Sequence, residues 1–302
     1  MKIDIIIPTW KRHELLSLAL NSLIKQTRKP DQVIVVYRQE DNESLNTIKK
    51  FKNVLNINEI LVEEPGVIYA ENKGINAASG DIIVFLDDDA EVKNNWLQLI
   101  ENNFNDNKNI VGVGGPDFIT GHHDPNYRKI IETIGKITFF GKIIGNHHHI
   151  SKSKLYVDVL KGVNMAFKAS VINLLDPKLQ SLHNQGNGSH WELDLCLQAT
   201  KYGKLLFDPA LDLLHHSNHT HFIHHLNLQN NSRNLSYVIL KNFNIFRKIF
   251  FILYITIIGN SQIIGFGKYI QLCVQNGVKL ATSDYYYSTK GLIRGVQLFI
   301  FK

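Results

Sequence analysis

A buried-strand pattern that runs straight into three acids constrains the fold of this chain more than any other feature. Five consecutive apolar residues, Ile82–Leu86, are followed directly by Asp87, Asp88 and Asp89. A short apolar run of this kind is typical of a central strand in a sheet. Because like charges crowded at the end of a strand repel one another, the three acids favour a divalent cation among them over a solvated acidic turn. Their hard oxygen ligands suit Mg²⁺ or Mn²⁺, and ligands of open α/β sheets bind outside the carboxyl ends of the strands.

The first 115 residues alternate between strand and helix patterns. This order predicts a mostly parallel, doubly wound α/β sheet flanked by helices. The predicted strands are Ile3–Pro8, Val33–Tyr37, Ile57–Val62, Ile82–Leu86 and Ile110–Gly114, and the predicted helices are His13–Gln26, Leu45–Phe51, Tyr69–Ala78 and Asn94–Phe104.

The pattern of residues 116–302 predicts an irregular stretch, then a second segment rich in strands, and finally a helical C-terminal region. Residues 116–149 favour loops, because Gly, His, Asn and Pro interrupt every periodic pattern there. We expect residues 1–115 and 116–225 to form two halves of one domain, and 226–302 a C-terminal helical extension. The later predicted elements are strands Leu155–Leu160, Val163–Phe167, Lys204–Phe207 and Leu211–His215, and helices Trp191–Tyr202, Leu228–Phe243 and Ile245–Ile258, with two further helices toward the C-terminus.

Composition narrows the class of partner. The net charge of +6 comes from scattered basic residues without a Lys/Arg-rich run, which argues against nucleic acid and favours phosphorylated ligands or an anionic membrane. Two cysteines, Cys196 and Cys273, argue against a disulfide framework. The sequence opens directly into a strand with no leader pattern, so we expect a cytoplasmic protein. The apolar segment Ile249–Gly259 is shorter than a spanning helix and predicts a core helix, an oligomer contact or a helix on the cytoplasmic membrane face.

A second acidic site follows about 100 residues after the first. Ser189 is a candidate N-cap, which would place Glu192 and Asp194 near the first turn of a helix. The helix dipole favours acids there, so capping is one explanation. The alternative is that one carboxylate acts as a general base and the other positions neighbouring groups.

Taken together, these segments resemble the family 2 glycosyltransferases, which are inverting enzymes with the GT-A fold that use nucleotide-diphosphate sugars. The resemblance covers about Lys2 to His215, and its segments occur in the family's order. They are the opening strand Ile5–Arg12, the segment from Glu64 to Asp81, the DxD position Asp87–Asp89, the strand Lys161–Lys168, the "ED" region Trp191–Leu195 and the strand Pro209–His215.

The resemblance implies a role for each site residue. Asp87 and Asp89 would bind Mn²⁺ or Mg²⁺ with His215 as a further ligand, and Glu192 would deprotonate the acceptor hydroxyl, with Asp194 in support. The donor would be a nucleotide-diphospho-sugar and the acceptor a glycan or a lipid-linked glycan of the cell surface. The implied donor-site residues are Pro8, Thr9, Glu40, Asp41, Asn72 and Asp88, and the implied acceptor-site residues are Gly162, Asn164 and Trp191.

Several positions depart from the family pattern and keep alternatives open. Lys11 stands where Asn is common, Glu71 where Arg is frequent, and Glu192 where Asp is usual, while Tyr37-Arg38-Gln39 replaces an Asp-rich strand end. These departures leave the nucleoside open, together with a non-catalytic sugar- or nucleotide-binding protein. A sugar nucleotidyltransferase is disfavoured because Pro8–Arg12 lacks glycine.

A run of histidines between His215 and His225 allows a second interpretation. A zinc site is one alternative, but the spacing matches no closed structural site and cysteine is absent nearby. The favoured interpretation places His215 in the active site and the other histidines in a polar loop over the donor.

Overall fold

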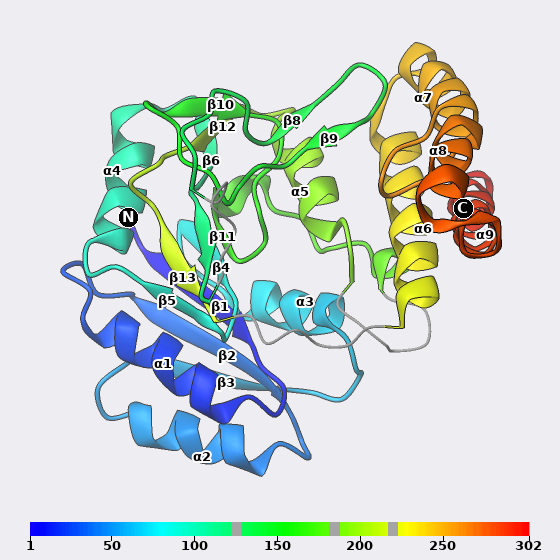
Figure 1. Ribbon diagram of the computed structural model, residues 1–302. Helices are drawn as coiled ribbons and strands as arrows, with labels where there is room; N and C mark the ends of the chain where they lie inside the picture. The colour runs from blue at the N-terminus through cyan, green and yellow to red at the C-terminus, as the bar shows by residue number, and fades with distance from the viewer. Residues whose placement is uncertain (122–127, 181–187, 217–222, 302) are drawn as a thin grey trace. The chain divides into compact units, whose positions relative to one another are not determined.

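The computed structural model describes residues 1–121, 128–180, 188–216 and 223–301, and divides the chain into two compact units. The first unit contains Met1–Lys136, Ile144–Leu175 and Leu195–His219, and the second contains Ile137–Ile143, Asp176–Asp194 and Thr220–Lys302. Figure 1 labels their elements.

The first unit is built on an eight-stranded sheet in the order β10-β12-β6-β11-β4-β1-β2-β3. β4, β1, β2 and β3 are parallel neighbours, whereas β11 is antiparallel to both β4 and β6, and β10 is antiparallel to β12. The prediction of a mostly parallel sheet is therefore confirmed. The strands are β1 Ile3–Pro8, β2 Gln32–Arg38, β3 Ile57–Val62, β4 Ile82–Leu86, β6 Ile110–Gly114, β10 Leu155–Val157, β11 Asn164–Lys168 and β12 Lys204–Phe207.

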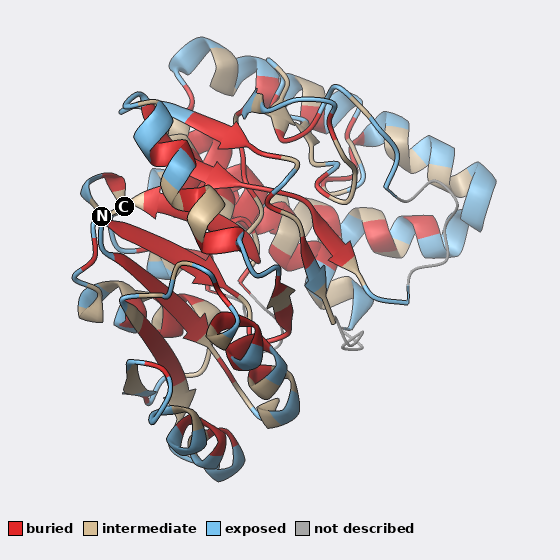
Figure 2. Ribbon diagram, turned by 90° about the vertical axis from the view of Figure 1, so that its left-hand side faces the viewer, coloured by how far each residue is buried: buried red, intermediate tan, exposed pale blue. Residues whose placement is uncertain are grey.

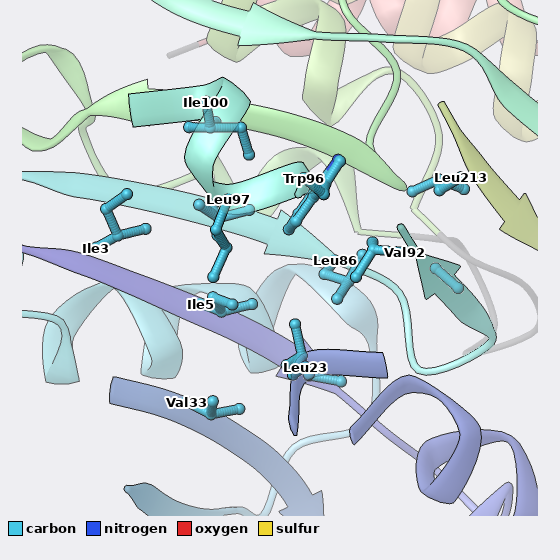
Figure 3. Packing of buried hydrophobic residues seen from close by; sticks show 14 of the residues in the cluster. Ile3, Ile5, Leu23, Val33, Leu86, Val92, Trp96, Leu97, Ile100 and Leu213 are labelled. Carbon is cyan, nitrogen blue, oxygen red and sulfur yellow. The ribbon is translucent and has the colours of Figure 1, made fainter. Parts of the chain in front are cut away.

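Apolar side chains from the central strands and from the helices against them form the core of this unit. β1 and β4 are buried along almost their whole length, as continuous apolar runs predict for strands covered on both faces, and Figure 2 shows this burial. Figure 3 shows Ile3 and Ile5 of β1 near Leu97 and Ile100, and Trp96 near Leu86. The helices of this unit are α1 His13–Ile24, α2 Asn42–Phe51, α3 Val67–Ala77, α4 Trp96–Asp106 and the end of α5 Trp191–Ala199.

A second sheet has three strands in the order β5-β13-β7, and its first strand in the chain, β5, follows shortly after β4. β5 (Ala90–Val92) follows the three acids directly, and it pairs with β13 (Leu213–His215), which in turn pairs with β7 (Asp117–Ile119). This small sheet therefore brings segments from three distant parts of the sequence to the acidic turn.

The second unit is mainly helical. It consists of α6 His224–Asn242, α7 Ile245–Ile257, α8 Phe266–Asn276 and α9 Val278–Ile300, together with residues 137–143 and 176–194. Within it, α6 and α9 pack closely against each other.

The predicted order of elements is confirmed, but several boundaries were wrong. The second helix begins at Asn42 rather than Leu45, because Asp41 caps it by accepting a hydrogen bond from the Ser44 N–H. Helix α5 begins at Trp191, so His190 and not Ser189 precedes it, and it ends at Ala199 rather than Tyr202. The segment 116–149, predicted as loops, contains β7 and the short strands β8 (Lys136–Ile137) and β9 (Ile143–Ile144).

Candidate functional site

The three acids occupy the connection between β4, which ends at Leu86, and β5, which begins at Ala90. Asp88 and Asp89 are buried, and Asp87 is half-buried. The Asp87 carbonyl accepts a hydrogen bond from the Ala90 N–H and closes the turn. The acids therefore lie at the carboxyl end of a central parallel strand, where the sequence pattern placed them.

Residues from the end of β1 hold the middle acid. The Thr9 hydroxyl donates a hydrogen bond of 2.7 Å to Asp88 Oδ2. The Arg12 guanidinium lies 2.5 Å from Asp88 Oδ1 and 2.8 Å from Asp89 Oδ2. Thr9 thus contacts an acid of the cluster, and Arg12 is a site residue to which the sequence analysis assigned no role.

β13 places His215 beside the acids. Its pairing with β5 sets His215 opposite Ala90, and His215 Nε2 lies 3.2 Å from Asp89 Oδ1. One ligand atom from each of Asp87, Asp89 and His215 lies within 4.8 Å of the others. Two carboxylates and an imidazole fit a divalent cation, and they are the three residues that the sequence analysis named for this role.

The charges of the cluster oppose one another strongly. Burial, and then repulsion from Asp89, raises the pKa of Asp87 to about 6. Burial also raises the pKa of Asp88, to about 7, and outweighs the charge of Arg12, which lowers it. For Asp89, burial acts in the same direction but is outweighed by the His215 hydrogen bond and the Arg12 charge, which lower its pKa. A divalent cation among these carboxylates would favour their ionised forms.

Asp117, at the start of β7, is a further charged residue of this site, and it was not predicted from the sequence. It is fully buried, with Oδ2 3.5 Å from His215 Nδ1 and Oδ1 3.1 Å from His148 Nδ1, and it also contacts Lys161. Burial would raise its pKa, but these hydrogen bonds and charges lower it overall. Burial lowers the pKa of His215, but its hydrogen bonds to Asp117 and Asp89 outweigh this and raise it to about 9. A cation that uses His215 must therefore displace a proton.

The other predicted donor-site residues make contacts that are mainly structural. Pro8 ends β1, and Glu40 lies on the surface, 3.5 Å from Arg38. Asp41 accepts hydrogen bonds from the backbone N–H groups of Ser44 and Lys11. Their roles in donor binding stay predictions.

Asn72, on α3, joins two segments that lie far apart in the sequence. Its amide donates to the Leu175 carbonyl at 2.9 Å and its oxygen accepts from the Leu175 N–H at 2.7 Å. This pair of bonds explains an asparagine at this position without a ligand, and its donor role also stays a prediction.

Asn164 of the predicted acceptor site is fully buried at the start of β11. Its Oδ1 accepts from Trp96 Nε1, and its Nδ2 donates to the carbonyls of Pro116 and Leu211 at 3.1 and 2.6 Å. The side chain therefore fixes the chain after β6 and before β13. Gly162 lies in the turn that precedes β11.

The predicted catalytic acids lie in the first turn of α5, in the second unit. Glu192 is half-buried, whereas Trp191 and Asp194 are buried. Asp194 accepts hydrogen bonds of 2.7 Å from both Lys241 Nζ and Asn242 Nδ2 on α6. These bonds fix the Asp194 carboxylate against α6. The catalytic role of Glu192 and the supporting role of Asp194 both stay predictions.

The histidines of this run that the structure describes contact different acids. His216 contacts Glu91 in the first unit, whereas His224 and His225 contact Asp284 in the second. His219 and His221 lie outside the described residues.

This architecture, a mostly parallel sheet with an acidic cluster at the end of a central strand, defines a GT-A-like protein. Residues 4–160, more than half of the chain, match the family model described as Glycosyl transferase family 2. The chain belongs to this family.

Curated relatives share the first part of the sequence. A glucosyl-dolichyl phosphate glucuronosyltransferase of Haloferax volcanii is 27% identical over 128 residues, which are 39% of this chain and 40% of that protein. A poly(ribitol-phosphate) beta-glucosyltransferase of Bacillus spizizenii is 30% identical over 159 residues, which are 46% of this chain and 25% of that protein. The aligned part of the chain thus spans less than half of either relative.

Among solved structures, residues 1–349 of Staphylococcus aureus TarS in complex with UDP-GlcNAc superpose with a TM-score of 0.64. The match covers 98% of this chain and 82% of that chain at 14% identity. A likeness at this identity bears on the fold, and it confirms the predicted GT-A architecture.

Proposed function

We propose that this protein is a metal-dependent, inverting glycosyltransferase that moves a sugar from a nucleotide-diphosphate donor to an acceptor hydroxyl. The observation that carries the proposal is the group Asp87, Asp89 and His215 at the carboxyl end of β4. Family membership supports the reaction class, and the TarS complex with UDP-GlcNAc supports a UDP-sugar as the first donor to test.

Asp87, Asp89 and His215 would hold Mn²⁺ or Mg²⁺, which supplies charge neutralisation for the departing nucleoside diphosphate. Arg12, which pairs with Asp88 and Asp89, would provide a further positive charge for the diphosphate. Pro8 and Thr9, at the end of β1, would border the nucleoside, with Asp88 toward the ribose or sugar.

In the proposed reaction, Glu192 accepts the proton of the acceptor hydroxyl. The acceptor oxygen forms a bond to the anomeric carbon as the bond to the diphosphate oxygen breaks, so the configuration inverts. Asp194, fixed by Lys241 and Asn242, would position this end of α5.

The proposed acceptor is a glycan or lipid-linked glycan at an anionic membrane surface. In α7, the large apolar side chains Phe246, Ile249, Leu253 and Ile257 are 70, 52, 50 and 61% exposed. Their helical spacing places them on one side, while Phe251 and Ile255 on another side are fully buried. No helix of the described residues is long and apolar enough to span a membrane, so this stripe suits a helix that lies on a membrane surface.

The net positive charge of the C-terminal helices is compatible with binding to anionic lipid. Residues 223–301 contain eight Lys or Arg and a single acid, Asp284. Such an excess of basic over acidic residues attracts a negatively charged leaflet. The basic residues are Arg233, Lys241, Arg247, Lys248, Lys268, Lys279, Lys290 and Arg294.

Thermal unfolding tests the donor site. We would measure the melting temperature with UDP-, GDP-, CMP- and dTDP-sugars, each with and without Mn²⁺, because a ligand of the folded state raises it. We expect a Mn²⁺-dependent shift with one nucleotide class that Asp89→Asn abolishes and Asp106→Asn, an exposed acid on α4, retains. Folded protein that shifts with none of these ligands would contradict the proposal.

The Glu192→Gln variant separates an enzyme from a binding protein. An enzyme should keep the nucleotide-dependent shift and lose about 10²- to 10⁴-fold of its turnover, measured as donor hydrolysis or transfer. A non-catalytic binding protein would show the shift without any Glu192-dependent turnover.

Vesicle co-sedimentation tests the membrane surface. We expect binding to vesicles that contain phosphatidylglycerol, weaker binding to pure phosphatidylcholine, and a loss in Phe246→Ser/Leu253→Ser. Equal partition of wild type and variant would reject the membrane assignment, and a shift from dimer to monomer in the variant would instead assign the stripe to contact between two copies.

A further inference from the structure

We propose that the second unit carries a separate transition-metal site formed by His224, His225 and Asp284, and that its cation is Zn²⁺ or a similar nitrogen-preferring ion. His224 and His225 are the first two residues of α6, and Asp284 lies in the second turn of α9. One ligand atom from each of the three lies within 4.8 Å of the others.

The distances match a shared cation. His224 Nε2 lies 3.0 Å from Asp284 Oδ1, and His225 Nδ1 lies 3.6 Å from the same oxygen. Ligands about 2.0–2.2 Å from a tetrahedral zinc ion lie about 3.3 Å from one another, so small side-chain rotations would complete the site. His224 is 66% exposed on its side chain, which gives a cation access from solvent.

Asp284 is the unusual member of the surface that α9 presents to α6. The buried residues of α9 are Ala281, Asp284, Ser288, Gly291 and Gly295, so a single acid interrupts a row of small side chains. Among the described residues, no Lys or Arg nitrogen lies within 4.0 Å of this carboxylate, and its ion-pair partners are the two imidazoles. A buried carboxylate requires a cationic or hydrogen-bonding partner, and a metal ion held with the imidazoles supplies the charge.

His225 offers a prepared ligand atom. Its Nδ1 is buried and makes no hydrogen bond among the described residues. The ring of Tyr287 stacks on the imidazole, with centroids 4.7 Å apart and an interplanar angle of 13°, and restricts its orientation. A preoriented imidazole with an available nitrogen is well suited to metal binding.

Close helix packing fixes the two halves of the site relative to each other. A Cβ atom added to Gly291 would lie 2.3 Å from the Gln229 carbonyl oxygen, so the α6 and α9 backbones approach closely there. One turn before Gly291, the Ser288 hydroxyl lies 3.0 Å from that of Ser232. Asp284 lies one further turn toward the N-terminus of α9, and its position beside the start of α6 follows from this packing.

The ligand set distinguishes this site from the one in the first unit. Two imidazoles and one carboxylate favour Zn²⁺, Ni²⁺ or Co²⁺, whereas the two carboxylates and single imidazole of Asp87, Asp89 and His215 are a better match for Mn²⁺ or Mg²⁺. Three protein ligands leave a fourth zinc position for water. The bound cation would join the start of α6 to α9.

Metal titration of the 302-residue chain tests this site. The chelator-treated protein would be titrated with Co²⁺, followed by its visible absorption, and the Co²⁺ would then be displaced with Zn²⁺. We expect a tetrahedral Co²⁺ spectrum in wild type and in Asp89→Asn, and its loss in His224→Ala. The Zn²⁺ affinity of His224→Ala should fall by more than the roughly 10- to 100-fold that loss of an outer-shell partner costs. Because His224 is exposed, this variant should keep its fold, which circular dichroism would check.

Asp284→Asn provides a second, isosteric variant. It should also lose the tetrahedral spectrum while the Mn²⁺-dependent behaviour of the first unit persists. The proposal is overturned if wild type gives no tetrahedral Co²⁺ spectrum, or if His224→Ala and Asp284→Asn bind Co²⁺ and Zn²⁺ as wild type does. Loss of the spectrum in Asp89→Asn alone would assign the signal to the first unit and would equally overturn it.

Discussion

The guanidinium of Arg12 lies 2.5 Å from Oδ1 of Asp88, a carboxylate with no exposed surface. A second nitrogen of Arg12 lies 2.8 Å from Asp89 Oδ2, so one cation compensates two of the three crowded acids. The pKa of Arg12 is raised because these acids outweigh the effect of its burial. Arg12 therefore stabilises the acidic turn in the absence of metal.

Removal of Arg12 should separate the stability of the metal-free protein from its metal affinity. Arg12→Ala leaves Asp88 and Asp89 without this charge, so the metal-free protein should melt at a lower temperature. Mn²⁺ would then bind to a more negative site. Because Arg12 is partly exposed and its charge is screened by solvent, we expect a gain in Mn²⁺ affinity of only about tenfold. Isothermal titration with Mn²⁺ and thermal unfolding measure the two effects.

Arg28→Ala is the matched control, because Arg28 pairs with Asp31, away from the three acids. It should leave the Mn²⁺ affinity unchanged. Weaker Mn²⁺ binding in Arg12→Ala would show that Arg12 supports the cation site rather than competing for its carboxylates.

Local sequence patterns predicted much of the fold and the centre of the site. The run from Ile82 to Asp89 predicts a buried strand with acids at its carboxyl end, because both properties follow from adjacent residues. The structure places His215 at the same turn through the β5–β13 pairing. His215 was predicted as a ligand only through the family resemblance.

The sequence did not predict contacts that depend on residues far apart in the chain. Asp117 lay in a stretch predicted as loops, and its burial against His215 results from the β7–β13 pairing. A three-residue strand is too short for a periodic pattern. The partner of His224 and His225 is Asp284, 59 residues after His225, so no local spacing rule could connect them.

Lys241 should be essential for the stability of the second unit. Its Nζ lies 2.7 Å from Asp194 and 2.9 Å from Asp176, and the hydrogen bond from Lys241 contributes to the lowered pKa of Asp176. Lys241→Met would leave both carboxylates without this partner. Because Lys241 is 30% exposed, we expect a loss toward the lower end of the roughly 3–5 kcal/mol typical of a broken buried pair. Urea unfolding measures it.

Lys279→Ala controls for the loss of a positive charge on these helices, because Lys279 is exposed. Its free energy of unfolding should stay within about 0.5 kcal/mol of wild type. Asn242 also donates a hydrogen bond to Asp194, and Tyr237 donates one to Asp176. A Lys241→Met variant as stable as this control would mean that these two hydrogen bonds are enough to stabilise the two acids.

The close approach of α9 to α6 should make Gly295 intolerant of a side chain. A Cβ atom there would lie 2.0 Å from Ser236 Oγ and 2.4 Å from the Arg233 carbonyl oxygen. The backbone atom cannot move without displacing α6, so Gly295→Ala should destabilise the protein by about 1–3 kcal/mol or more. Thermal or urea unfolding would detect this change.

Gly277→Ala separates this packing effect from backbone strain. Gly277 has φ +85 with open space around its Cβ position, so its substitution costs only conformational strain. If helix packing dominates, Gly295→Ala should be the more destabilising of the two. The opposite order would show that α6 and α9 adjust to the added methyl group.

His147 should make the stability depend on pH below neutrality. Its ring is buried, with Nε2 3.1 Å from the Val159 carbonyl oxygen. Burial lowers its pKa to about 4 from 6.5, only partly opposed by that hydrogen bond. Between these pH values the unfolded chain binds a proton that the folded chain excludes, so stability falls as the pH drops from about 6.5 toward 4. At about 1.4 kcal/mol per unit of pKa, the full loss from this residue is roughly 3 kcal/mol.

Urea unfolding of wild type and His147→Gln at pH 7.0 and pH 5.0 tests this dependence. Glutamine retains an N–H donor for the Val159 carbonyl but does not titrate. We therefore expect the variant to be less stable than wild type at pH 7.0 and to lose less stability on acidification. His190, also buried with its pKa lowered to about 4, remains in both proteins, so part of the acid sensitivity should persist in the variant. An identical loss in the two proteins between pH 7.0 and 5.0 would mean that His147 is not excluded from protonation in the folded state.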